Sequence, residues 1–299
     1  MGVEIAIDGV IVVDKPAGWT SHDVVNKIRR IADTKKVGHL GTLDPMATGV
    51  LPLVVGRATR LAQFYTKADK VYDGVIRFGV ATDTYDSEGE PVGDSRPCEF
   101  TPEDMERELG RFRGTFPQTP PPVSAKKIGG VPAYKLARKK VDVEIPPVEV
   151  TVHSIRILES GPCELRAEVH CSAGTYLRAI AHDLGAALGC GAHLASLRRL
   201  RSGDFSIEQA KTLDELAALR EGGRLGEALI PAARLVPQFP SETVDTLTAS
   251  QIRQGRDFRV SPFRGAKGAP MVKAVTAAGE LVAIGEAVLP HLYHPVLVF

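Results

Sequence analysis

The stretch from Gly38 to Gly56, GHLGTLDPMATGVLPLVVG, constrains the fold more than any other part of the chain. Its first half is rich in glycine and proline, which indicates a loop, and its second half is an apolar run typical of a buried strand. Asp44 is the one acid in these nineteen positions, and His39 is the one titratable base. This frame suits a carboxylate held for chemistry, although Asp-Pro is also a common turn initiator and a lone histidine often only packs.

Composition limits the classes of protein that remain. The 299 residues suffice for one large domain with an appendage or for two domains, and no run approaches the ~18 apolar residues of a membrane span. The N-terminus lacks a basic stretch and carries Glu4 and Asp8, so we expect no secretory signal and a cytoplasmic location. No C-x-x-C pair occurs, so we expect free thiols and no zinc site at the four cysteines, which are Cys98, Cys163, Cys171 and Cys190.

Periodicity and capping signals predict an α+β fold with a mixed, mainly antiparallel sheet. Strands are expected at 10–13, 50–55, 70–83, 148–160 and 163–174, and helices after Thr20 and at 58–68, 101–114, 175–189 and 212–223. The chain turns irregular near Pro240 and then restarts with a helix at 248–258 and strands at 271–275, 280–288 and 294–299. No glycine-rich phosphate loop occurs, so a bound nucleotide cofactor is not expected.

Charge is unevenly distributed although the net charge is +1. Residues 124–141 contain no acid and six basic residues: Lys126, Lys127, Lys135, Arg138, Lys139 and Lys140. They follow a proline- and glycine-rich stretch, and residues 133–140 are able to form a helix. Such a cluster is the footprint of a phosphate-rich partner, but a solvated loop face explains it equally well.

Further candidates lie at the ends of predicted elements. Arg178 and Tyr176 stand near a helix start, where an arginine can hold a carboxylate such as Asp44 ionised through a forked pair of hydrogen bonds. Tyr72 lies on a strand. The ordinary alternatives to these functional roles are that Arg178 lies on the surface and that both tyrosines only pack in the core. The segment SLRRLRSGDF contains Leu197, Arg198, Arg199 and Arg201. These residues are compatible with RNA contacts, and equally with a solvated helix end or turn.

Four motifs in order resemble the bacterial tRNA pseudouridine synthase B (TruB) family, from about residue 9 to about residue 213. They are DKPAGWTSHDVV, GHLGTLDPMATGVLPLVVGRATRL, KVYDG and HCSAGTYLRAIAHDLGAALGCGAHLASLRRLRSGDF. The resemblance implies a pseudouridine synthase fold for residues 1–238, with a basic thumb-like loop near 120–145. It also implies a small, β-rich, PUA-like RNA-binding domain at 239–299. Ala173 replaces the lysine usual in the family.

The resemblance implies that the enzyme flips uridine-55 out of the tRNA T-loop and isomerises it to pseudouridine. No cofactor or metal is implied. Asp44 matches the essential carboxylate, Arg178 its partner, and Tyr72 the tyrosine that stacks on the base and helps remove a proton. Positions that line the pocket are matched by His39, Tyr176 and Leu197. The route taken by Asp44 stays open: attack at C1′, attack at C6 or elimination through a glycal.

Two other functions are compatible with the same motifs. One is a non-catalytic module that binds or folds tRNA, with Asp44 as a turn residue. The other is a synthase that works inside a guide-RNA particle. The long thumb segment and the small C-terminal unit favour a stand-alone enzyme, which we expect to act on the T-arm as a monomer without an obligate protein partner or membrane.

Overall fold

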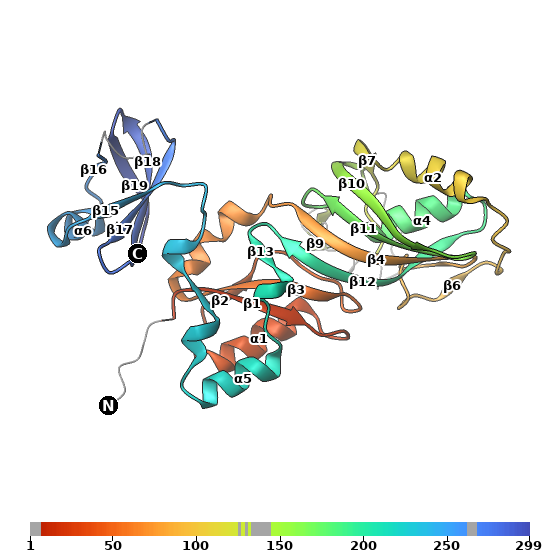
Figure 1. The fold of residues 1–299 in the computed structure, drawn as a ribbon, viewed down its shortest axis with the longest axis horizontal. Helices are drawn as coiled ribbons and strands as arrows, with labels where there is room; N and C mark the ends of the chain where they lie inside the picture. The colour runs from red at the N-terminus through yellow and green to blue at the C-terminus, as the bar shows by residue number, and fades with distance from the viewer. Residues whose placement is uncertain (1–6, 125–126, 129–130, 133–144, 262–267) are drawn as a thin grey trace.

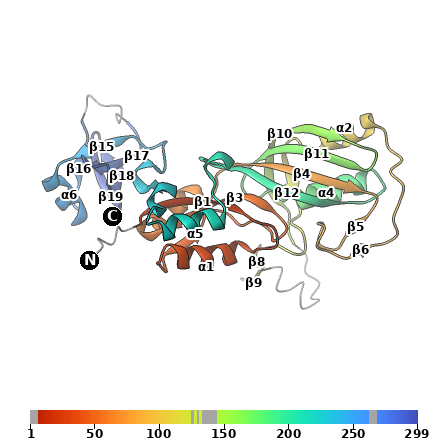
Figure 2. The same ribbon diagram turned by 60° about the horizontal axis from the view of Figure 1, so that its bottom comes forward.

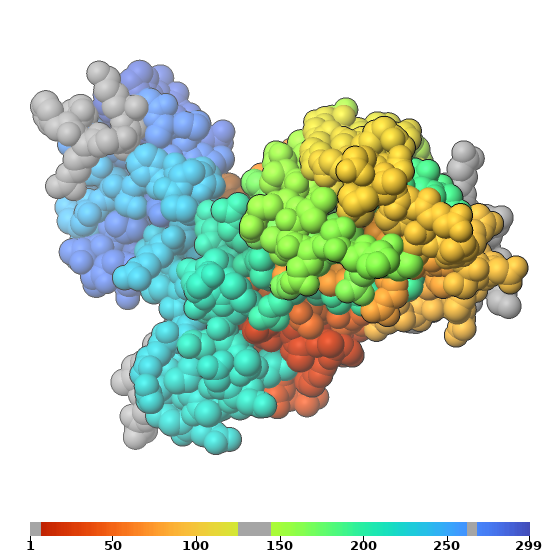
Figure 3. Space-filling view, turned by 45° about the vertical axis from the view of Figure 1, so that its right-hand side comes forward, coloured from red at the N-terminus to blue at the C-terminus, as the bar shows by residue number. Residues whose placement is uncertain are grey.

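The computed structural model describes residues 7–124, 127–128, 131–132, 145–261 and 268–299. A ten-stranded sheet forms the body of the molecule, and a five-stranded sheet forms a smaller lobe at the C-terminal end (Figure 1). The space-filling view shows this lobe, in blue, beside the larger body (Figure 3). The α+β class expected from the sequence is confirmed.

The large sheet is mixed and mainly antiparallel. Its strand order is β14-β1-β3-β12-β4-β11-β10-β7, with β2 paired to β3 and β13 to β12, and the β3–β12 pair is parallel. The bounds are β1 Gly9–Lys15, β2 Val37–His39, β3 Thr48–Val55, β4 Lys70–Phe78, β7 Gly114–Gln118, β10 Val148–Ser160, β11 Glu164–Cys171, β12 Ala192–Ser202, β13 Phe205–Ser206 and β14 Leu229–Pro231. Two-stranded ribbons join β5 Ala81–Thr82 to β6 Pro91–Val92 and β8 Lys127–Ile128 to β9 Val131–Pro132.

The helices begin where the sequence places capping residues. Thr20 and Thr101 each form a capping box at the start of α1 Ser21–Ile31 and α2 Pro102–Gly110. The other helices among the described residues are α4 Leu177–Ala187, α5 Leu213–Glu221 and α6 Thr246–Arg253. The helix expected at 58–68 is a 3₁₀ helix, η1 Gly56–Tyr65, and shorter 3₁₀ turns are η2 Ile207–Gln209, η3 Leu225–Ala228 and η4 Ala232–Arg234.

Helices α1, α2, α4 and α5 share one hydrophobic core with one face of the large sheet, and α1 lies beside α5 (Figures 1 and 2). Strand β1 shows why its sequence is apolar throughout. Ile11 and Val13 enter this core, whereas Val10 and Val12 enter a second core on the opposite face. Because successive side chains alternate between faces, a strand buried on both sides carries no polar alternation.

The C-terminal lobe is a mixed β-sheet of order β15-β17-β18-β19-β16. Its strands are β15 Ser241–Val244, β16 Phe258–Arg259, β17 Met271–Thr276, β18 Leu281–Leu289 and β19 Leu292–Val298. Leu281, Ile284 and Phe299 from this lobe join the core that also contains Val10 and Val12 of β1. The lobe is therefore docked on the body by apolar contacts.

Two expectations are corrected. The segment SLRRLRSGDF is not a helix end or turn, because its residues up to Ser202 belong to β12, a central strand that lies between β3 and β4. Cys98 and Cys163 are not free thiols but form a disulfide, with Cα atoms 5.7 Å apart. Cys171 and Cys190 are free, as expected, and the structure shows that both are buried.

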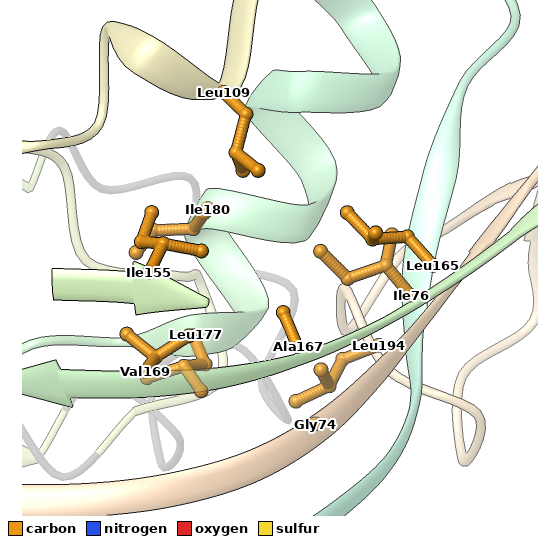
Figure 4. A pocket seen from close by; sticks show the side chains of 10 residues that line it. All are labelled: Gly74, Ile76, Leu109, Ile155, Leu165, Ala167, Val169, Leu177, Ile180 and Leu194. Carbon is orange, nitrogen blue, oxygen red and sulfur yellow. The ribbon is translucent and has the colours of Figure 1, made fainter. Parts of the chain in front are cut away.

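Within the described part of the chain, no helix is long and apolar enough to cross a membrane. The helix predicted at 133–140 lies outside the described residues. A small cavity of about 20 Å³ lies between α4 and the sheet and is lined only by glycine and apolar side chains such as Leu109, Ile180 and Leu194 (Figure 4). A void of this size without polar partners does not hold an ordered ligand, so it is a packing defect and not the functional site.

Candidate active site

Asp44 lies in the loop between β2 and β3, and this loop is pinned on both sides. The Ser21 hydroxyl, at the start of α1, accepts a hydrogen bond from the Leu43 amide (2.9 Å) and donates one to the Leu43 carbonyl (3.1 Å). The buried Lys15 ammonium donates to the Pro45 carbonyl at 3.0 Å. The residues before and after Asp44 are thus fixed to two different elements, which positions its carboxylate on a rigid frame.

Arg178, in the first turn of α4, is the direct partner of Asp44. Its Nη2 donates to Asp44 Oδ1 at 3.0 Å, and its Nε lies 3.0 Å from Asp44 Oδ2. The arginine side chain is 5% exposed, and the aspartate side chain is 33% exposed. The structure thus brings together the two side chains that the resemblance pairs. Because the arginine is buried and the carboxylate is partly open, the pair presents one acid group to an incoming molecule.

Arg178 also reaches a second carboxylate that the sequence analysis did not identify. Its Nη1 donates to Asp86 Oδ2 at 3.2 Å, and Asp86 is buried. The Thr84 hydroxyl (2.6 Å) and the Glu88 amide (3.1 Å) donate to the other oxygen of Asp86. Arg178 is therefore held between two aspartates that lie 42 residues apart in the sequence, and no local pattern could have linked them.

Burial and charge act against each other at Asp44. Desolvation raises the pKa of Asp44 above its usual range, the Arg178 guanidinium opposes this rise, and the charge of Asp86 adds to it. Lys15 also opposes it more weakly, and desolvation lowers the pKa of the Lys15 ammonium to about 8. A carboxylate in this setting is poorly solvated, so it stabilises a nearby positive charge more strongly than a carboxylate in water does.

Tyr72 of β4 and Arg199 of β12 are paired directly opposite each other on the two antiparallel strands. Tyr72 is buried, and desolvation raises the pKa of its phenol. Arg199 is 1% exposed and donates to the carbonyls of Val50 (2.7 Å), Thr42 (3.2 Å) and Gly41 (3.1 Å). We therefore withdraw Arg199 from the expected RNA contacts: it fixes the loop that carries Asp44 and the strand that follows.

The three residues expected to line the pocket differ in setting. His39 is half-buried, its Nδ1 accepts a bond from the Gly41 amide (3.3 Å), and desolvation lowers its pKa. Tyr176 directly precedes α4. Its backbone N–H donates to the side-chain oxygen of Gln118 at 2.8 Å, and its carbonyl accepts from the side-chain nitrogen of Gln118 at 3.0 Å. Leu197 is buried in the core of the sheet. Desolvation raises the pKa of both the Tyr72 and the Tyr176 phenol, and the charge of Asp44 adds to the rise.

The basic residues are only partly placed. Arg198 donates to both carboxylate oxygens of Asp14, at 3.0 and 2.7 Å, and Arg201 is exposed. Of Lys127 the structure describes the backbone, in β8. The remaining basic positions lie outside the described residues and are Lys126, Lys135, Arg138, Lys139 and Lys140.

The site offers one partly open carboxylate, a buried arginine that holds it, the buried phenol of Tyr72 and the partly buried phenol of Tyr176. It does not resemble a glycosidase site, in which two carboxyl groups face each other across the substrate, because the second acid, Asp86, is covered and paired to the same arginine. A single carboxylate in an apolar frame suits a reaction in which a cation at a sugar carbon is stabilised and water is excluded.

Two family models match the chain in sequence order. Residues 29–177 match "TruB family pseudouridylate synthase (N terminal domain)", and residues 178–236 match "tRNA pseudouridylate synthase B C-terminal domain". Fold and site thus define a pseudouridine synthase. Among curated proteins, tRNA pseudouridine synthase B of Solibacter usitatus (strain Ellin6076) is 59% identical over 292 residues, which cover 98% of this chain and 100% of that protein. The chain belongs to the TruB family.

Other relatives extend the comparison. The tRNA pseudouridine synthase B of Symbiobacterium thermophilum is 47% identical over 253 residues, which cover 83% of this chain and 82% of that protein. Among solved structures, an H/ACA RNP bound to a substrate RNA containing 2'-deoxyuridine contains a chain that matches with a TM-score of 0.71 and 27% identity, over 100% of this chain and 87% of that chain. A Cbf5-Nop10-Gar1 complex matches with a TM-score of 0.69 and 29% identity, over 97% and 82%.

Proposed function

We propose that the protein converts uridine-55 in the T-loop of tRNA to pseudouridine, with Asp44 as the catalytic carboxylate. The observation that carries the proposal is the Asp44–Arg178 pair, at 3.0 Å, inside the motif that resembles the TruB family. The names of the relatives support tRNA as the substrate. In the reaction the N1–C1′ bond breaks, the base turns, a C5–C1′ bond forms, the proton on C5 leaves and N1 takes up a proton.

Asp44 acts where positive charge develops as the glycosidic bond breaks. Arg178 orients the carboxylate and keeps it ionised against the desolvation that raises its pKa. The apolar frame keeps water from capturing the separated sugar cation. Asp86 acts through Arg178 as a positioning residue, because it holds the guanidinium from the side away from Asp44.

The target base has to leave the stacked T-arm before it reaches Asp44, at a cost of a few kcal/mol. The aromatic ring of Tyr72 supports stacking on the extruded uracil. Because burial raises the pKa of Tyr72, the phenol is neutral, and removal of the C5 proton by this group requires that its own proton first pass to another base. His39, Tyr176 and Leu197 complete the pocket in this proposal.

In the same proposal residues 1–238 form the catalytic domain, and residues 239–299 form a PUA-like RNA-binding domain. The start of β15 at Ser241 and the separate apolar core of the C-terminal sheet support that division. The basic segment near 120–145 acts as a thumb over the RNA. We propose that the enzyme is a cytoplasmic monomer and that no guide RNA, partner protein, cofactor or metal is needed for the chemistry.

The test is to incubate purified protein with an unmodified tRNA transcript and with an isolated T-arm stem-loop, without added cofactor, guide RNA or partner. Chemical labelling of pseudouridine followed by primer extension then maps the product. The proposal expects one modified nucleotide, at position 55, in both RNAs. Modification only after a guide RNA is added would show that the protein is a guide-RNA-dependent synthase and not a stand-alone enzyme. Binding without modification would show that it is a non-catalytic RNA-binding module.

A further inference from the structure

Two histidines and an aspartate converge at a point outside the active site. Asp69 directly precedes β4, His153 lies in β10 and His170 lies in β11. His153 Nε2 is 3.1 Å from Asp69 Oδ2, and His170 Nε2 is 3.7 Å from the same oxygen. The three atoms all lie within 4.8 Å of one another. The consecutive strands β10 and β11 and the start of β4, which is distant in the sequence, therefore direct nitrogen and oxygen donors toward one place.

Strand register puts this cluster on the face of the sheet opposite Tyr72. His170 pairs with Val71, whereas Tyr72 pairs with Val169, and paired residues share a face while neighbours along a strand alternate. The register of β10 shifts at His153, so this residue is the extra one of a β-bulge. A bulge re-aims a side chain, and here the His153 ring lies 4.6 Å from the His170 ring, centroid to centroid.

The donor set is that of a zinc-like ion. Two imidazole nitrogens and one carboxylate oxygen are typical zinc ligands at about 2.0–2.2 Å, which places neighbouring ligand atoms of a tetrahedron about 3.3 Å apart. The observed 3.1 and 3.7 Å bracket that separation. Mg²⁺ and Ca²⁺ prefer oxygen ligands only. The donor chemistry therefore selects a first-row transition metal or Zn²⁺.

One of the three ligand atoms has no other partner among the residues that the structure describes. His170 Nε2 is buried and makes no hydrogen bond within the described residues, and its 3.7 Å separation from Asp69 is too long for one. A simple ion pair between His153 and Asp69 would leave this nitrogen unsatisfied. A metal ion between the three side chains satisfies it, because the neutral imidazole presents a lone pair there.

We propose that Asp69, His153 and His170 bind one Zn²⁺-like ion that fastens β10, β11 and the start of β4 together. The three side chains are 31–45% exposed, so the ion enters from solvent. An open hollow of about 470 Å³ adjoins Asp69 and His170 and includes Lys67 and Arg201, and solvent from it fills the fourth position. The ion has a structural role, because the cluster faces away from the side of β4 that carries Tyr72.

The test uses untagged full-length protein that has been treated with a chelator and dialysed. Isothermal titration with Zn²⁺ is expected to show one ion per chain, and Zn²⁺ but not Mg²⁺ is expected to raise the melting temperature. His153→Ala and Asp69→Ala each remove one ligand and are expected to weaken binding by at least about 100-fold, beyond the 10–100-fold typical of outer-shell changes. Co²⁺ substitution should give the visible absorption of a four-coordinate site.

His294→Ala is the matched control, because His294 Nδ1 lies 2.7 Å from Asp257 Oδ1 in a histidine–aspartate pair outside the proposed site. This variant is expected to bind Zn²⁺ as the wild type does. Three results would overturn the proposal: no saturable binding to the wild type, wild-type affinity in either ligand variant, or an equal loss in His294→Ala. Melting curves without metal show whether each variant is folded, so a binding loss is not confused with unfolding.

Discussion

Replacing Arg178 with lysine tests whether the shape of the guanidinium, and not only its charge, prepares Asp44 for reaction. Arg178 contacts Asp44 through Nη2 and Nε, and Asp86 through Nη1, and it also donates to the carbonyls of Thr84 and Val123 at 3.1 and 3.0 Å. Lysine keeps the positive charge, but its single ammonium cannot span two carboxylates in this way. One of the two acids therefore loses its partner.

Breaking a buried ion pair costs about 3–5 kcal/mol. If that cost falls on the reaction barrier, at about 1.4 kcal/mol for each tenfold in rate, Arg178→Lys slows isomerisation by a hundredfold to several thousandfold. The assay is the single-turnover release of tritium from C5 of the target uridine in a T-arm stem-loop. Filter binding of the same RNA should give an unchanged dissociation constant, because Arg178 is covered in the free protein.

Arg166→Lys is the matched control for this experiment. Arg166 donates to both oxygens of Asp73, at 3.0 and 2.8 Å, but its side chain is 41% exposed and lies away from Asp44. An exposed pair contributes about 0–1 kcal/mol, so this variant should keep the wild-type rate. If a folded Arg178→Lys variant reacts as fast as Arg166→Lys, a positive charge alone is sufficient at this position and the shape of the guanidinium is not needed.

Three further predictions concern pH, packing and the disulfide. Because desolvation raises the pKa of Asp44, the reaction rate should fall on acidification at a pH above the ordinary aspartate range of about 4; a limb at or below pH 4 in single-turnover profiles would contradict this. Gly49→Ala should lower the free energy of unfolding by at least about 2 kcal/mol in urea titrations, because Gly49 has φ +96° and an added Cβ collides with the Arg199 carbonyl; an unchanged midpoint would be the opposing result. Cys98→Ser should lose about 4 kcal/mol under oxidising conditions, since its bond to Cys163 closes a 65-residue separation, and thermal melts of both proteins should coincide in reductant.

Local signals in the sequence were sufficient for most elements. The Thr20 and Thr101 capping boxes are set by residues three positions apart, and both form as expected. Strand β4 alternates as predicted, with Tyr72, Ile76 and Phe78 buried on one face. The Asp44–Arg178 pair spans 134 residues, and the resemblance of the two motifs to the TruB family, more than any local signal, led us to expect it.

The features that we did not predict from the sequence depend on contacts that no local pattern encodes. Strand β12 was not expected because arginines indicate a solvated segment, yet Arg199 is buried and satisfied by three backbone carbonyls from the Asp44 loop and β3. Asp86 lies in an acidic part of the sequence that indicates no partner for it, and only the fold shows that it pairs with Arg178. The Cys98–Cys163 pairing likewise depends on which strands meet, and cysteine spacing alone does not reveal it.

The proposed function requires that one sheltered carboxylate, Asp44, performs the isomerisation. Its most direct test compares wild-type protein with Asp44→Asn on the same T-arm RNA, because this change removes the charge and keeps the shape. We expect the wild type to form pseudouridine, and we expect the variant to bind the RNA with unchanged affinity and to form none over many wild-type half-lives. Measurable turnover by the folded variant would show that Asp44 is not the catalytic carboxylate.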